Sequence, residues 1–147
     1  MKLYALNNIV SVGNNIYFID IIGKRIHLKN ERHEGLYGIN IGKDEIDLIE
    51  DIEISEWLLN ILFDKKEDGV WVIDNLSNEG LIDFPYYTIE RDESGEAYMF
   101  KSGGKFIMYI DYVRELQNAY HFFSDTEGVD FLNDDIDEKI KKLYNLI

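Results

Sequence analysis

The sequence has no cysteine and a single proline among its 147 residues. Without cysteine the chain has no disulfides, no thiolate metal sites and no cysteine nucleophile, and it needs no oxidising compartment. No apolar run approaches the roughly 18 residues of a membrane span, and the first residues lack the pattern of a secretory signal. The abundance of Ile, Asn, Lys, Asp and Tyr is typical of an AT-rich bacterial or phage genome. We therefore expect a cytoplasmic protein without a membrane segment.

Positive charge is also scarce. Lys and Arg total 15 against 29 Asp and Glu, which gives a formal net charge of -14. This charge repels phosphate backbones and anionic lipid surfaces, so we expect no direct contact with nucleic acid or membrane. Hydrophobic residues make up 46% of the chain and aromatic residues 14%, which is too apolar for a disordered acidic tail. We expect one globular domain over residues 1–147.

The clearest local pattern is a three-stranded meander followed by a helix. Apolar and β-branched runs at 86–91, 96–101 and 105–110 are separated by turns that contain glycine. From 112 to 123, apolar residues recur at helical spacing, which predicts a helix that packs across the sheet.

The rest of the chain predicts more strands and two more helices. Residues 2–29 indicate hairpins, and 70–73 a buried strand. If residues 44–63 formed a single long helix, their apolar side chains would lie on all sides of it and not on one face. The pattern therefore favours irregular chain and then a short helix from Glu56, capped by Ser55. A last helix is predicted at about 135–146. The fold class is therefore α+β: a largely antiparallel sheet of N-terminal hairpins and central meander, with a short middle helix and two C-terminal helices packed on it.

No motif for catalysis or for a cofactor is present. Gly38, Gly42 and Lys43 resemble a phosphate-binding loop, but the glycine spacing is too short and Asp44 follows the lysine. The histidines form no pair at metal-ligand spacing on one helical face. They stand at His27, His33 and His121. We expect no metal, no cofactor and no catalytic residue, unless distant histidine and carboxylate side chains form a site in space.

One stretch stands out by its density of negative charge. Residues 44–56 contain seven carboxylates and neither Lys nor Arg. Such repulsion destabilises a folded chain, and a surface that docks a basic partner has this composition. A solvated acidic face is the alternative explanation, and a second acidic cluster at 125–138 is an alternative contact surface. The candidate partner-binding residues are Asp44, Glu45, Asp47, Glu50, Asp51, Glu53 and Trp57, the last as an aromatic anchor.

These observations predict a binding protein and not an enzyme. The hypothesis is a small acidic inhibitor of the immunity type. It would bind a basic toxin or enzyme stoichiometrically and so neutralise it, and the target would be one that cleaves nucleic acid. The first alternative is a phage protein that blocks a host defence enzyme by mimicking the charge of DNA. The second is a hydrolase or small-ligand-binding protein whose site is built from distant His, Asp and Glu side chains.

Overall fold

The computed structural model describes residues 4–13, 15–29, 38–65, 69–73 and 87–124. Contacts between Cα atoms divide the chain into two compact units. Among the described residues, the first unit comprises those up to Glu53 together with Tyr112–Arg114, and the second comprises Ile54–Asp111 and the chain from Glu115 onward. Each unit is built on its own antiparallel sheet.

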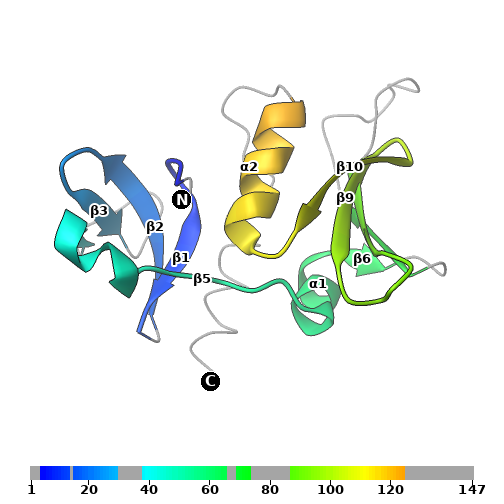
Figure 1. Cartoon of the computed structure of the whole chain (residues 1–147), viewed down its shortest axis with the longest axis horizontal. Helices are drawn as coiled ribbons and strands as arrows, with labels where there is room; N and C mark the ends of the chain where they lie inside the picture. The colour runs from blue at the N-terminus through cyan, green and yellow to red at the C-terminus, as the bar shows by residue number, and fades with distance from the viewer. Residues whose placement is uncertain (1–3, 14, 30–37, 66–68, 74–86, 125–147) are drawn as a thin grey trace. The chain divides into compact units, whose positions relative to one another are not determined.

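The first unit is a five-stranded antiparallel sheet in the order β4-β3-β2-β1-β5 (Figure 1). Its elements are β1 (Ile9–Val12), β2 (Asn15–Ile22), β3 (Ile26–Lys29), β4 (Gly38–Ile41), the 3₁₀ helix η1 (Lys43–Leu48) and β5 (Glu50–Asp51). The turn between β1 and β2 includes Gly13, whose φ of 63° is accessible to glycine at little cost.

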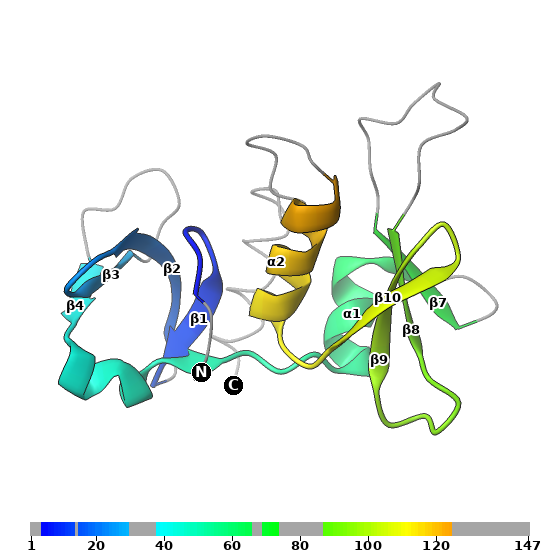
Figure 2. The ribbon, with the colours of Figure 1, turned by 45° about the horizontal axis from the view of Figure 1, so that its top comes forward.

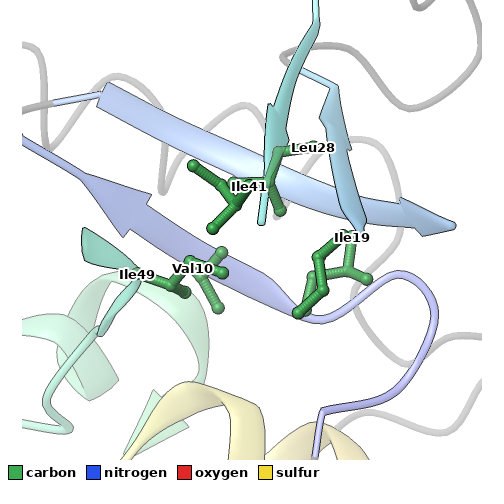
Figure 3. Packing of buried hydrophobic residues seen from close by; sticks show 6 residues of the cluster. Val10, Ile19, Leu28, Ile41 and Ile49 are labelled. Carbon is green, nitrogen blue, oxygen red and sulfur yellow. The ribbon is translucent and has the colours of Figure 1, made fainter. Parts of the chain in front are cut away.

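One buried cluster of the first unit consists of aliphatic side chains, which come from every strand except β5 and from Ile49. Alternate residues of a strand point to one face, so β3 buries Ile26 and Leu28 while His27 and Lys29 stay half-buried. The cluster also includes Ile49, which lies between η1 and β5 and contacts the strands beside Val10 (Figure 3). It comprises Val10, Ile19, Ile26, Leu28, Ile41 and Ile49.

The second unit is an antiparallel sheet in the order β10-β9-β8-β7-β6, with two helices. Its elements are α1 (Glu56–Leu62), β6 (Asp64–Lys65), β7 (Val70–Ile73), β8 (Tyr87–Arg91), β9 (Tyr98–Ser102), β10 (Lys105–Ile110) and α2 (Val113–Ser124), of which α2 begins in the residues assigned to the first unit. Helix α1 begins as the sequence predicts, because the Ser55 hydroxyl accepts a hydrogen bond from the Leu58 amide at 3.2 Å.

Both helices of the second unit pack on the same face of its sheet. The buried Trp71 on β7 donates its indole N–H to Asn60 of α1 at 2.9 Å. Tyr87 on β8 stacks on Phe100 of β9 and meets Tyr120 of α2 edge to face, with ring centroids 5.3 Å apart. The strand register puts Trp71 and Tyr87 on one face, because Trp71 pairs with Ile89, two residues along from Tyr87.

The α+β class with antiparallel pairing is confirmed, and so are the meander and the helices that begin near 56 and 113. The strands form two sheets, however, where the sequence predicted one. Residues 43–48 are a 3₁₀ helix where irregular chain was expected, and residues 4–6 form no strand. The predicted helix at 135–146 lies outside the described residues, and the single domain stays a prediction. Within the described ranges, no helix has the length and apolar character needed to cross a membrane.

Candidate functional site

The acidic stretch forms a short exposed ridge in the first unit. Residues 43–50, called the 43–50 ridge below, consist of η1, Ile49 and the first residue of β5. Ile41 precedes η1 with 4% of its surface exposed, and Ile49 follows it with 1% exposed, so both ends are fastened to the core. No residue of η1 itself is buried. Figure 2 shows η1, in cyan, as a separate coil between β4 and β5.

Local hydrogen bonds explain the 3₁₀ form of this segment. The Glu45 amide donates to the Gly42 carbonyl at 3.0 Å, and the Ile49 amide donates to the Ile46 carbonyl at 3.1 Å. Both bonds span three residues, as in a 3₁₀ helix. Asp44 and Glu45 lie in the first turn, where carboxylates interact favourably with the N–H groups of the backbone. The ridge therefore has a defined backbone although its side chains reach into solvent.

Four of the predicted partner-binding carboxylates belong to this ridge and are exposed. They are Asp44, Glu45, Asp47 and Glu50. Two positively charged residues lie beside them: Lys43, which is exposed, and Arg25, whose guanidinium lies 3.7 Å from the Glu45 carboxylate. That ion pair is half exposed on both sides, so solvent screens it. The ridge keeps a net negative charge that reaches into solvent.

Asp51 differs from its neighbours, because its side chain points inward. Successive residues of a strand face opposite ways, so Glu50 is exposed while only 2% of the Asp51 side chain is accessible. Its two carboxylate oxygens accept hydrogen bonds from Nε and Nη2 of Arg114, at 2.9 and 3.0 Å. Asp51 was predicted to contribute to the acidic surface. Its buried ion pair means that it adds no net charge to that surface, and we leave it out of the contact.

Tyr4 completes the surroundings of this ion pair. The Arg114 guanidinium carbon lies 5.4 Å from the centre of the Tyr4 ring, within the range of a cation–π contact. Burial raises the pKa of the Tyr4 hydroxyl, and the nearby Asp51 carboxylate raises it further. The arrangement joins β5 to the first turn of α2, and its role is structural.

The last two predicted contact residues, Glu53 and Trp57, follow the ridge in the sequence and do not belong to it. Glu53 is exposed and its backbone forms an isolated bridge with Tyr112. Trp57 belongs to the second unit, on α1, and 54% of its surface is exposed. Its neighbour Glu56 forms an ion pair with Arg91 at 3.0 Å. Trp57 thus has the exposure that an aromatic anchor needs.

One group of side chains bears on the alternative hypothesis of a site built from histidine and carboxylate residues. Nδ1 of His27 lies 3.4 Å from one oxygen of Asp20, and Nζ of Lys29 lies 3.3 Å from the other. The far side of the His27 ring meets the backbone at Gly38, where an added Cβ would lie 2.5 Å from Nε2. Asp20 is thereby shared with a cation and the ring is enclosed on the glycine side, which fits a packed surface pair better than an acid–base site.

Several residues considered in the sequence analysis are not described by the structure. His33 and the acidic cluster at 125–138 lie outside the described residues, as does the side chain of His121. Within the part of the chain that the structure covers, no group of three or more His, Asp or Glu side chains is arranged to hold a metal ion.

Sequence reasoning missed two kinds of residue at this site. The exposure of Ile46 and Leu48, at 39% and 52%, was not predicted, and the neighbouring carboxylates gave no signal of it, because Ile52 lies between Asp51 and Glu53 and is buried. Arg114 carried no signal, because it is 63 positions from Asp51 and only the fold brings them together.

Comparison with protein-family models, with curated proteins and with solved structures finds no match to this chain.

Proposed function

We propose that this protein is a stoichiometric inhibitor of the immunity type, which binds a basic protein through the 43–50 ridge. The observation that carries the proposal is that η1 has no buried residue although both of its ends are fastened to the core. Asp44, Glu45, Asp47 and Glu50 are thereby held on an exposed segment of defined backbone. A preorganised segment loses less conformational entropy on binding than a flexible one.

The proposed target is a toxin or enzyme that cleaves nucleic acid. A groove that holds phosphates is positively charged, so carboxylates on a projecting ridge complement it and accelerate association. The net charge of -14 attracts the same positively charged partner over a longer range than the ridge alone. The proposal assigns no reaction to the chain itself, and it places the protein in the bacterial cytoplasm, where such a toxin would act.

Growth rescue tests the proposal. The protein is co-expressed in bacteria with each member of a panel of basic nuclease toxin domains, and growth is compared with a panel of acidic enzyme toxins as control. Rescue from at least one basic nuclease is expected. Failure against every basic nuclease, or equal rescue from acidic toxins, would contradict the proposal.

A pair of matched variants assigns the effect to the ridge. The double substitution Asp47→Lys with Glu50→Lys should abolish rescue, because it reverses the charge of two exposed ridge residues. Glu93→Lys with Glu96→Lys changes the net charge equally at exposed residues of the β8–β9 turn, and should retain rescue. Equal loss in both variants would assign the effect to overall charge and not to the ridge.

A further inference from the structure

The apolar residues of η1 have a regular relation to its carboxylates. A 3₁₀ helix has three residues per turn, so residues three apart lie in one row along it. Asp44 and Asp47 form one row, Glu45 and Leu48 a second, and Lys43 and Ile46 the third. The row of aspartates therefore has an exposed aliphatic side chain on either side of it.

Ile46 and Leu48 are exposed although the isoleucines on either side of η1 are buried. Ile41 and Ile49 belong to the aliphatic cluster of the first unit, whereas Ile46 and Leu48 have 39% and 52% of their surface exposed. Exposed aliphatic residues within an acidic surface gain free energy only when a partner covers them, because their burial removes apolar surface from water. Carboxylates mainly accelerate association, whereas buried apolar anchors mainly slow dissociation.

We infer that Ile46 and Leu48 are the anchors of the contact, and that the partner surface has lysine or arginine opposite the aspartate row and apolar areas on either side of those cationic residues. The inference rests on the proposed function and adds the chemistry of the partner. Charge complementarity decides the occupant: the partner groups that meet Asp44, Glu45 and Asp47 have to be cationic, and the partner areas that cover Ile46 and Leu48 have to be apolar. Nucleic acid and anionic lipid headgroups offer no such cationic groups, so the occupant is a basic protein surface.

Two synthetic peptides serve as probes of this chemistry. The first is an amphipathic helix of about 14 residues with one leucine face and one lysine face. The second has serine in place of each leucine, with the same length and charge. Both carry a fluorescent label, and their binding to the full chain is measured by fluorescence anisotropy at low and at high salt.

The expected result is that the wild-type protein binds the leucine peptide about tenfold more tightly than the serine peptide at high salt, where only the apolar part of the contact survives. Ile46→Ser with Leu48→Ser should remove this preference. The matched control is Ile21→Ser, at a residue on β2 of the same unit with 57% exposure, which should keep the preference. The milder pair Ile46→Ala with Leu48→Ala should weaken it partly, and the melting temperature of every variant checks the fold.

The outcomes separate the inference from the proposed function. Equal binding of the two peptides by the wild type, or a leucine preference that survives Ile46→Ser with Leu48→Ser, overturns the inference. The proposed function still stands in that case if low-salt binding of both peptides is weakened by Asp47→Lys with Glu50→Lys. If this charge reversal leaves low-salt binding unchanged, the ridge is not the contact surface. That result would contradict the proposed function as well.

Discussion

Asp51 and Arg114 form a two-pronged ion pair that is almost completely removed from solvent. The side chains are 2% and 9% exposed, and the two hydrogen bonds are 2.9 and 3.0 Å long. The pair joins β5 to the first turn of α2, beside the main-chain hydrogen bond from the Val113 amide to the Ile52 carbonyl. The residue that the sequence placed in the middle of an acidic surface is therefore part of the framework that holds that surface.

Breaking this pair from one side should strongly destabilise the protein. Asp51→Asn removes the carboxylate that accepts two hydrogen bonds from the buried Arg114 guanidinium, and we expect the free energy of unfolding to fall by about 3 kcal/mol or more. Arg114→Met should cost a similar amount, whereas Asp51→Asn with Arg114→Met together should cost much less than the sum, because each single variant already loses the same ion pair. Urea unfolding of the four proteins measures the coupling.

The exposed ion pair of the second unit provides the control for that cycle. Glu56→Gln removes the carboxylate that pairs with Arg91, where both side chains are more than 40% exposed, so stability should change little. A loss at Glu56→Gln as large as at Asp51→Asn would contradict the assignment of the Asp51 effect to burial.

Gly38 should be intolerant of any side chain. A Cβ at this position would lie 2.5 Å from Nε2 of His27 and 2.5 Å from the backbone oxygen of Leu28, and the second atom cannot move without distorting β3. We expect Gly38→Ala to lower the free energy of unfolding by about 1–3 kcal/mol. Gly23→Ala is the control, since its nearest atom would be 4.0 Å away. Thermal unfolding of the two variants measures this difference. Equal melting temperatures for Gly38→Ala and Gly23→Ala would contradict the close packing at Gly38.

Stability should decline in alkali partly because of Tyr4. Burial raises the pKa of Tyr4 in the folded state above the ordinary value of 10.0, with the Asp51 carboxylate as the second cause. The folded protein then holds this proton more tightly than the unfolded chain, so the contribution is complete below pH 10 and is lost as the pH rises toward the folded pKa. Tyr4→Phe should make the loss shallower in urea unfolding followed across this range. Identical slopes for wild type and Tyr4→Phe would contradict the shift.

Elements with a short-range code were predictable. The meander at β8–β10 follows alternating runs separated by glycine turns, where Gly95 and Gly103 take positive φ values of 74° and 58°. The start of α1 follows from a serine cap, and α2 from its apolar spacing. These signals lie within a few residues of the structure that they specify, so no knowledge of distant partners was required.

Features set by distant contacts were not predictable. The inward direction of Asp51 depends on its pairing with Val10 across the sheet and on a guanidinium 63 positions away. The separation into two sheets depends on which strands become neighbours, and the hydrophobic pattern of each strand is compatible with either arrangement. The burial of Ile41 and Ile49 on either side of the exposed residues 43–48 also depends on contacts with distant strands, which the local sequence does not specify.

Binding through the 43–50 ridge is tested most directly by the rate at which this protein associates with the basic nuclease identified by growth rescue, measured by stopped flow between about 0.05 and about 0.5 M salt. We expect the association rate to fall at least about tenfold over this range. Asp47→Lys with Glu50→Lys should slow the low-salt rate by a similar factor, and Glu93→Lys with Glu96→Lys should slow it much less. A rate that is independent of salt, or that responds equally to the two charge reversals, would contradict binding through the 43–50 ridge.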